Sequence, residues 1–302
     1  MNRMQFLKLL LISILSIISS CTSYFASRIT DPIEGSIMHN IALENQTIYY
    51  YTIGDKNLPP LVFLHGILSF TEAYSELIEA LSEKYFVIGI DMRGHGRSSI
   101  GDMSSSYIEI VEDIMKVTNK LGYDRFYIVG HSAGGFAMLS LAKYFPEKVI
   151  KGVSIASLYN HKGIYYRDGD DYLTKNGFMD NINGRDNYIL KVMDRAYEQI
   201  GEKKKFDNTK KIMMNGGNSI YPSFSDAQVR EITTPILVIV AGKDNRIKPE
   251  HTKKLAELLP NSDLLIVPGA KHGGISYKKK YVKLISNNIF QFLSKNENSI
   301  LY

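Results

Sequence analysis

The sequence predicts an α/β fold in which a mostly parallel central sheet is flanked by helices and carries an inserted helical cap. Three observations support this fold. Short apolar segments alternate with segments of helical periodicity, and a glycine-rich turn joins one such strand to a helix at residues 130–135. The alternation stops over residues 158–225, where Tyr, Asn, Asp, Gly and Lys dominate. Strands this apolar indicate a sheet covered on both faces.

Before the cap, strands and helices follow one another at short intervals. Segments 36–43 and 46–53 are joined by a turn at Glu44 and Asn45, which predicts a hairpin. Further strands are expected at 61–64, 85–90, 125–129 and 149–156. Helices are expected at 72–83, 106–121 and 135–144, where apolar residues recur every three or four positions.

The second half of the fold follows the insertion. The cap, residues 158–225, is expected to contain a helical segment at 188–200. Strands at 235–240 and 263–267 and helices at 249–259 and 278–293 then complete the body. The core is therefore divided in sequence into residues 36–157 and 226–302, and the length suits one α/β domain with an insertion.

Residues 1–20 have the pattern of an export signal. Arg3 and Lys8 give a positive start, and the apolar run that follows is shorter than the about 20 residues that cross a bilayer. The run ends in Ile18-Ser19-Ser20-Cys21, which resembles the lipobox of bacterial lipoproteins. This resemblance implies cleavage before Cys21, a lipid with acyl chains such as palmitate on Cys21, and a tether over residues 21–35.

Cys21 is the only cysteine of the 302-residue chain. The alternative is an ordinary signal peptide in which Cys21 occurs by chance. A single cysteine in an exported protein favours lipidation, because it leaves no partner for a disulfide within the chain. We therefore expect a protein of the cell envelope that is attached to a membrane through its N-terminal lipid.

The composition excludes several kinds of partner. The formal net charge of +5 falls further once residues 1–20 are removed, and it is too small to predict a nucleic-acid partner. The clusters Lys203–Lys205 and Lys278–Lys280 are interpreted as solvated faces, with contact to anionic lipid as the alternative. No H-E-x-x-H or paired Cys/His spacing occurs, so neither a metal nor a cofactor is predicted. A monomer or weak oligomer is expected.

The glycine-rich turn Gly130-His131-Ser132-Ala133-Gly134 fits G-x-S-x-G, the pattern of a nucleophile elbow. In such an elbow a serine lies on a sharp turn between a strand and a helix, as the flanking segments predict here. The alternative is a structural serine in a glycine-rich turn. A catalytic serine needs a base within hydrogen-bond reach and a carboxylate that orients this base.

The two partners of Ser132 are sought after the next strands. Asp244 follows the strand at 235–240, and His272 follows the strand at 263–267. The carboxyl ends of parallel strands share one edge of the sheet, so both residues are expected beside Ser132. His272 is the candidate base by elimination among seven histidines, and Asp263 is the weaker alternative to Asp244.

Three other histidines lie next to glycines in the first half of the core. His95 and His131 lie in glycine-rich turns and are interpreted as structural, whereas His65 precedes the loop that should complete the site. A tetrahedral intermediate needs two backbone N–H donors, which are expected at Ala133 and Ile67, with Leu68 as the alternative to Ile67.

Together these residues resemble the capped, esterase/lipase-like branch of the α/β-hydrolase fold family. The matching motifs run from about residue 60 to 275 and include His65-Gly66, the stretch Asp91–Ser98, Gly130–Gly135 and Gly242-Lys243-Asp244. The resemblance implies that Asp91–Ser98 braces its loop. It also implies a serine hydrolase that cleaves a small-molecule carboxylic ester through an acyl-enzyme without a cofactor.

Two groups of alternatives remain open at this point. The same triad could act on a C–C bond, a thioester or a lactone, because fold and triad are shared while the pocket differs. The chain could also be a non-catalytic envelope lipoprotein that binds a small ligand. Two other enzyme classes of this fold, the epoxide hydrolases and the haloalkane dehalogenases, are excluded, because they have an aspartate where Ser132 stands.

Overall fold

The computed structural model describes residues 22–101, 107–165, 185–215 and 223–295. The strands of these residues form one eight-stranded sheet in the order β1-β2-β4-β3-β5-β6-β7-β8. Their bounds are β1 Ile37–Leu43, β2 Gln46–Ile53, β3 Pro60–Leu64, β4 Phe86–Ile90, β5 Phe126–His131, β6 Val149–Ile155, β7 Ile236–Ala241 and β8 Ser262–Val267. Only the β1–β2 and β2–β4 pairs are antiparallel, which confirms the prediction of a mostly parallel sheet.

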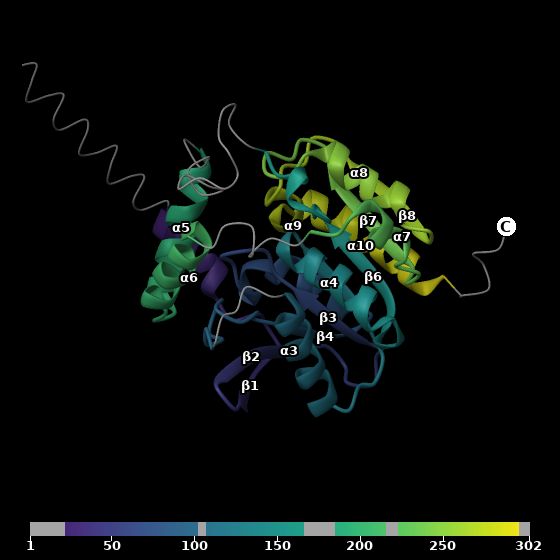
Figure 1. The fold of residues 1–302 in the computed structure, drawn as a ribbon. Coiled ribbons are helices and arrows are strands. Elements are labelled where there is room, and N and C mark those ends of the chain that lie inside the picture. Colours follow the sequence, from purple (N-terminus) through teal and green to yellow (C-terminus); the bar gives the residue numbers. More distant parts are fainter. Residues whose placement is uncertain (1–21, 102–106, 166–184, 216–222, 296–302) are drawn as a thin grey trace, which may run out of the picture.

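Helices cover both faces of the sheet (Figure 1). Their bounds are α2 Ser75–Ser82, α3 Tyr107–Lys120, α4 Ala133–Tyr144, α5 Arg185–Gln199, α6 Lys203–Asn215, α7 Asp226–Arg230, α8 Pro249–Leu258, α9 Gly274–Tyr277 and α10 Lys279–Ser294. Helices α2, α9 and α10 pack on one face, and α3, α4 and α8 pack on the other. In β3, Leu61 and Phe63 belong to the first layer and Val62 and Leu64 to the second. All four are fully buried, as expected of a parallel strand covered on both sides.

The predicted elements agree with the structure to within a few residues, and the differences have physical reasons. The helix expected at 72–83 begins as a 3-10 turn at Thr71–Tyr74 before α2. Helix α4 starts at Ala133, so a single residue, Ser132, separates it from β5. Helix α6 was not predicted, because its first residues, Lys203–Lys205, suggested only a solvated face.

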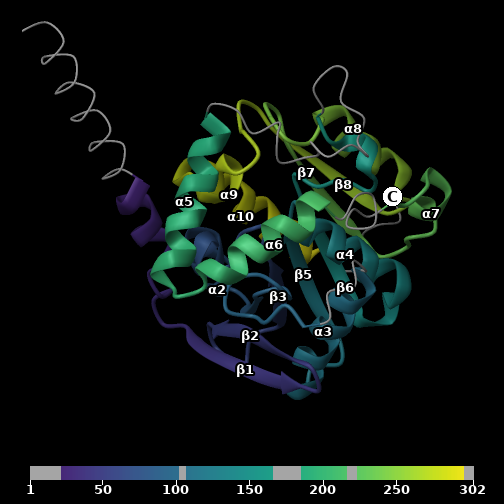
Figure 2. The same ribbon diagram turned by 60° about the vertical axis from the view of Figure 1, so that its left-hand side comes forward.

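The described part of the cap consists mainly of α5 and α6, which lie together outside the sheet (Figures 1 and 2). The chain leaves the sheet after β6 and returns before α7 at almost the same point. There the N–H of Phe224 donates to the carbonyl of Tyr159 over 2.8 Å, and the Asn160 amide donates to the carbonyl of Phe224 over 3.2 Å. The insertion is therefore closed at its base by direct hydrogen bonds.

The described part of the expected tether, residues 22–35, packs against the body of the protein. Residues 22–30 are helical, and Ala26 and Ile33 are buried in the same core layer as the cap residue Tyr197. Thr30 also donates a hydrogen bond to Gln199 of α5 over 3.1 Å. The apolar side chains of this segment explain the packing: Ala26 and Ile29 lie in the helix and Ile33 follows it, and all three contact the same core cluster.

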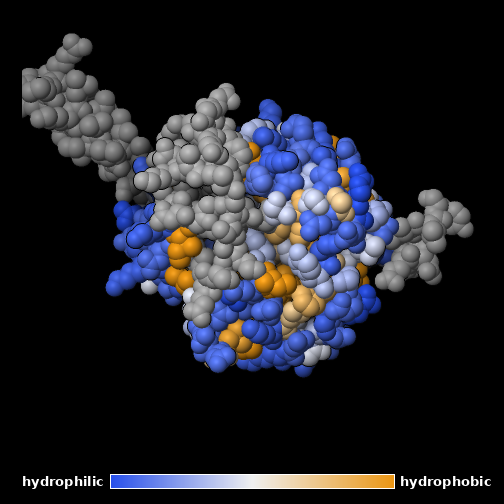
Figure 3. Space-filling model, in the orientation of Figure 1, coloured by the Kyte–Doolittle hydropathy of each residue, from blue (hydrophilic) through white to orange (hydrophobic). Residues whose placement is uncertain are grey.

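The predicted signal peptide and Cys21 lie outside the described residues. Within the described ranges, none of the helices combines the length and the apolar character that a bilayer crossing requires. Figure 3 shows that the coloured part of one face is dominated by hydrophilic residues with small, separate apolar patches. On this face the apolar residues are therefore dispersed, as is usual for a water-exposed surface.

Candidate active site

Ser132 lies in a strained turn between β5 and α4. Its backbone has φ 54° and ψ −117°, in the region that residues with a Cβ rarely adopt. The turn is held from both sides: the N–H of Ser132 donates to the carbonyl of Ile155 over 2.9 Å. Its carbonyl accepts the hydroxyl of Ser157 over 2.7 Å. The predicted nucleophile elbow is thus present as a backbone geometry.

The flanking glycines allow the strand and the helix to approach closely. A Cβ added to Gly130 would lie 2.2 Å from the carbonyl oxygen of Gly134. A Cβ added to Gly135 would lie 2.7 Å from the Cβ of Ser157. Side chains at these positions would push the helix away from the turn, so the elbow depends on their absence.

The structure brings Ser132, His272 and Asp244 together. The Nε2 atom of His272 lies 3.0 Å from the hydroxyl oxygen of Ser132, and its Nδ1 atom lies 2.8 Å from Oδ2 of Asp244. Ser132 follows β5, Asp244 follows β7 and His272 follows β8, so all three lie at the carboxyl edge of the sheet. With Nδ1–H donated to the carboxylate, the neutral imidazole presents Nε2 as an acceptor to the serine hydroxyl.

Asp244 is held as a carboxylate. It is buried, which raises its pKa, but His272 and the backbone N–H donors outweigh burial and bring the pKa below its usual value. The second oxygen of the carboxylate accepts the N–H groups of Arg246 over 2.8 Å and Ile247 over 2.9 Å. These two bonds fix the plane of the carboxylate, so that the other oxygen is left to orient His272.

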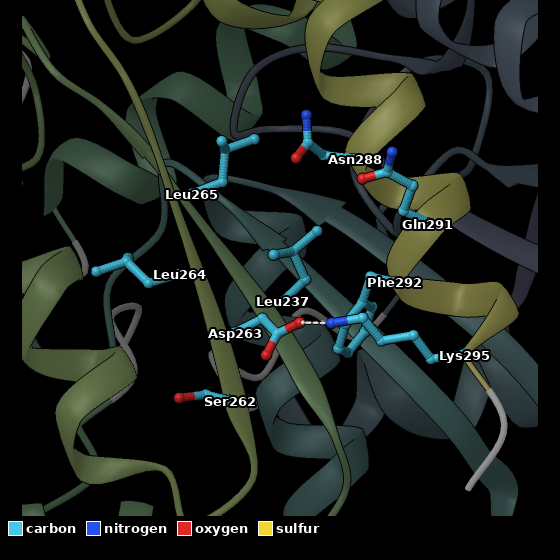
Figure 4. Close-up of a pocket in the computed structure, with 9 residues that line it drawn as sticks. All are labelled: Leu237, Ser262, Asp263, Leu264, Leu265, Asn288, Gln291, Phe292 and Lys295. Carbon is cyan, nitrogen blue, oxygen red and sulfur yellow. Dashed lines mark hydrogen bonds and ion pairs between the residues drawn. The ribbon is translucent and has the colours of Figure 1, made fainter. Parts of the chain in front are cut away.

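Asp263, the weaker alternative to Asp244, lies elsewhere. It is the second residue of β8, at the opposite end of that strand from the His272 loop, and it pairs with Lys295 over 2.6 Å. Figure 4 shows this pair crossing a pocket of about 320 Å³ between β8 and the end of α10. Ser132, His272 and Asp244 do not line that pocket. The pocket is therefore separate from the site, and Asp263 takes no part in orienting His272.

The oxyanion loop (residues 65–69) lies beside Ser132. A Cβ added to Gly66 would lie 3.4 Å from the Cβ of Ser132. The carbonyl of Gly66 accepts the Nδ1–H of His65 over 2.7 Å and the N–H of Ser69 over 3.2 Å. The C=O of Gly66 and the N–H of Ile67 belong to one trans peptide unit and point in opposite directions. Anchoring this carbonyl therefore fixes the direction of the Ile67 N–H.

The backbone N–H groups of Ala133, Ile67 and Leu68 have no hydrogen-bond partner among the described residues. Leu68 has φ 56°, a conformation that the sequence did not indicate for a residue with a branched side chain. Leu68 is buried while Ile67 is only partly buried. The predicted donors thus keep free N–H groups, as an oxyanion hole requires.

The loop after β4 supports the oxyanion loop, as the family resemblance implied. The carboxylate of Asp91 accepts the N–H of Thr71 over 2.9 Å and the N–H of Arg97 over 3.0 Å. The N–H of Met92 donates to Nε2 of His65 over 3.0 Å. Residues 91–98 therefore hold the loop that precedes α2 rather than contributing chemistry of their own.

Three buried histidines surround the site as neutral side chains. Burial, the largest cause in each case, lowers the pKa of His65 to about 4 and the pKa values of His95 and His131 to about 3. His131 contacts Tyr74 through Nδ1 and the carbonyl of His272 through Nε2. Sequence reasoning missed Tyr74, because it stands within a helix-like segment and no motif marks it.

No group of three or more His, Cys, Asp or Glu side chains is placed to hold a metal ion in the described ranges. The described site consists instead of one hydroxyl, one imidazole, one carboxylate and backbone N–H groups. This arrangement is suited to nucleophilic attack on a carbonyl carbon.

Comparisons with known proteins agree with the geometry. Residues 59–176 match the family model for the alpha/beta hydrolase fold. A predicted esterase/lipase of Haemophilus influenzae is 26% identical over 254 residues, which cover 80% of this chain and 85% of that protein. The bifunctional esterase/perhydrolase DCH of Acinetobacter calcoaceticus is 26% identical over 248 residues, covering 75% and 89%. The structure of a carboxylesterase from Bacillus subtilis superposes with a TM-score of 0.69 at 19% identity, covering 90% and 98%.

Proposed function

We propose that this chain, which has the α/β-hydrolase fold, is a serine hydrolase that cleaves carboxylic ester bonds. The observation that carries the proposal is the continuous hydrogen-bonded path from the Ser132 hydroxyl through His272 to Asp244, with distances of 3.0 Å and 2.8 Å. The esterase names of the two relatives support an ester as the substrate. The substrate is a small molecule, and the reaction needs no cofactor.

In the proposed reaction, His272 removes the proton of Ser132 as the hydroxyl oxygen attacks the carbonyl carbon of the ester. Asp244 keeps the Nδ1–H of His272 in place and stabilises the imidazolium that forms. The resulting tetrahedral intermediate carries its negative charge on the former carbonyl oxygen. His272 then gives its proton to the leaving alcohol, and an acyl-enzyme on Ser132 remains.

The N–H groups of Ala133 and Ile67 are the proposed donors to the oxyanion. Ala133 is the first residue of α4, where the helix N-terminus favours negative charge. Preorganised donors of this kind are worth about 10²–10³ in kcat each, because they need no rearrangement as charge develops. In the second half of the reaction, His272 activates a water molecule that attacks the acyl-enzyme, and Ser132 is released.

The test uses the full-length protein in detergent, with p-nitrophenyl esters of increasing acyl length and a Ser132→Ala variant beside the wild type. We expect ester hydrolysis that is lost in the variant, and labelling of Ser132 by a fluorophosphonate probe. The dependence on acyl length measures the size of the acyl pocket. Labelling without ester hydrolysis would redirect the assignment to a C–C bond, thioester or lactone. Absence of both would favour a non-catalytic binding protein.

We also propose that a lipid on Cys21 attaches the protein to a membrane of the cell envelope. The lipobox-like sequence that ends at Cys21 supports this. Metabolic labelling with a palmitate analogue should mark the wild type and not a Cys21→Ala variant. Equal labelling of the two proteins would contradict the proposal.

A further inference from the structure

We propose that Tyr74 and His131 are positioning residues that fasten the oxyanion loop to the His272 loop (residues 268–273). The inference rests on the proposed function, because it assigns to both loops a role in one reaction. Neither residue touches the substrate in this proposal. They act through Gly66 and through the backbone of His272.

A line of three hydrogen bonds connects the two loops. The N–H of Gly66 donates to the hydroxyl oxygen of Tyr74 over 3.0 Å. The hydroxyl of Tyr74 lies 2.9 Å from Nδ1 of His131, and Nε2 of His131 lies 3.0 Å from the carbonyl oxygen of His272. The first residue of this line lies in the oxyanion loop, and the last is the proposed base.

Each hydrogen bond in this line has only one possible donor and one possible acceptor. The carbonyl of His272 only accepts, so Nε2 of His131 carries the hydrogen. In a neutral imidazole the other nitrogen is then an acceptor, so the hydroxyl of Tyr74 donates to Nδ1. Burial lowers the pKa of His131 to about 3, which keeps its ring neutral at physiological pH. The oxygen of Tyr74 remains free to accept the N–H of Gly66.

The line is rigid because it is buried. Tyr74 is 1% exposed and His131 is 2% exposed. The ring of Tyr74 packs against Phe63 of β3 and Tyr277 of α9, with centroid distances of 5.2 Å and 5.6 Å. Hydrogen bonds away from water are stronger, and a lost partner leaves a buried polar group unsatisfied. Tyr74 and His131 are therefore held in one geometry, away from the thermal motion of the surface.

The position of the line explains what it does for the reaction. A Cβ added to Gly66 would lie 3.0 Å from the Tyr74 hydroxyl, 3.1 Å from Nδ1 of His131 and 3.4 Å from the Cβ of Ser132. Asp244 orients the side chain of His272, while His131 holds its backbone. Tyr74 holds the N–H of Gly66, next to the peptide that carries the Ile67 donor. The base and the oxyanion donor are thereby kept at a fixed separation.

The first experiment compares Tyr74→Phe with wild type in ester hydrolysis. Removing the hydroxyl should lower kcat by about tenfold to a hundredfold, the loss expected of slightly misplaced catalytic groups. KM should change little, because the constraint serves the transition state. The matched control is Tyr159→Phe. Tyr159 is 2% exposed and donates to Asp226 over 3.0 Å, so its variant loses a tyrosine hydrogen bond away from the triad and should keep kcat.

The second experiment tests whether the two residues act as one unit. His131→Gln should lower kcat in the same way, and the double variant Tyr74→Phe/His131→Gln should be no worse than the poorer single variant, because both break the same line. The affinity for a boronic acid that forms a tetrahedral adduct on Ser132 should fall in parallel with kcat. The thermal midpoint of each variant measures its stability. A general loss of stability would not make the affinity for the boronic acid fall in proportion to kcat.

Several results would overturn the inference. These are wild-type kcat in both single variants, additive losses in the double variant, or losses confined to KM. If Tyr74→Phe does not fold, His131→Gln and the boronic acid decide the question alone. A wild-type enzyme with no Ser132-dependent activity would instead refute the proposed function, so the two failures are distinguishable.

Discussion

Gly134 lies directly against Leu64: a Cβ added to Gly134 would come within 2.4 Å of the Leu64 carbonyl oxygen. This contact places the first turn of α4 on the end of β3 with no side chain between them. Because β3 continues into the oxyanion loop and α4 begins at Ala133, the contact sets the distance between the two proposed oxyanion donors.

Replacing this glycine tests the contact. Gly134→Ala should lower the free energy of unfolding by about 1–3 kcal/mol and reduce kcat, because the methyl group meets backbone atoms that cannot rotate away. The control is Gly122→Ala, where φ is 81° and no atom lies within 4 Å of the added Cβ. It should cost about 1 kcal/mol through backbone strain alone and leave kcat unchanged. Urea denaturation measures both, and equal kcat values in the two variants would contradict the prediction.

The triad variants should separate nucleophile, base and orienting acid. Ser132→Ala and His272→Ala should each lower kcat on the order of 10⁴-fold or more. Asp244→Asn should lower it by roughly 10³–10⁴-fold, because the amide favours the wrong imidazole tautomer. Asp263→Asn is the control, since Asp263 pairs with Lys295 outside the site and should have wild-type rates. Steady-state kinetics on one ester suffices, and a strong loss in Asp263→Asn would contradict this assignment.

Stability should fall steeply on the acid side of neutrality. His65, His95 and His131 have pKa values of about 4, 3 and 3 when folded, against about 6.5 in the unfolded chain. Below about pH 6.5 the unfolded chain therefore binds more protons than the folded protein, so the free energy of unfolding decreases as pH falls. Glu72 opposes this, because burial raises its pKa to about 7 and the folded protein holds that proton.

For these four groups together the excess is about two protons, which corresponds to about 2.7 kcal/mol per pH unit. His251, whose pKa burial lowers to about 4, adds to this excess. Asp91 and Asp113, whose pKa values burial raises, oppose it. Urea denaturation at several pH values between about 4.5 and 6.5 gives this slope directly. His95→Gln should reduce the slope by about one proton, because glutamine does not titrate. A free energy of unfolding that is constant over this range would show that these histidines are not buried as neutral groups.

The cap should loosen when Tyr197 loses its hydroxyl. The Tyr197 hydroxyl donates to the carbonyl of Ser69 over 3.0 Å and accepts the N–H of Gly96 over 2.9 Å, and its ring meets Phe70 edge-on at 5.4 Å. Tyr197→Phe should make the cap several-fold more sensitive to limited proteolysis, since local opening costs less free energy. Thr209→Val removes a second cap contact, to the carbonyl of Gly94, and should act in the same direction. Unchanged cleavage in both variants would contradict the prediction.

Much of this site was predictable because its signals are local in sequence. The strand before Ser132, the glycines around it and the strands that precede Asp244 and His272 each mark a position on the sheet edge. The parallel topology then brings the three residues together without further information. The role of the Ile67 N–H as a donor to the oxyanion stays a prediction. The structure fixes only the direction of this N–H, through the anchored carbonyl of Gly66.

The parts that were not predictable depend on contacts distant in sequence. Tyr74 meets His131 across 57 positions, and nothing in a helical segment marks one tyrosine for that contact. Helix α6 has a lysine-rich start, and its packing is visible only once Phe206 lies against Tyr197. Residues 22–30 depend in the same way on their contact with α5. In each case tertiary packing determines the conformation of a segment whose own sequence does not specify it.

The hydrogen bonds that join Phe224 to Tyr159 and to Asn160 also make the cap an exchangeable module. An insertion whose two ends meet can be lengthened, shortened or replaced while the sheet on either side keeps its register. Substrate preference can therefore diverge by recombination of one segment, without new mutations in the catalytic machinery. For protein engineering, residues 160 and 223 mark natural junctions at which a foreign cap could be grafted onto this core.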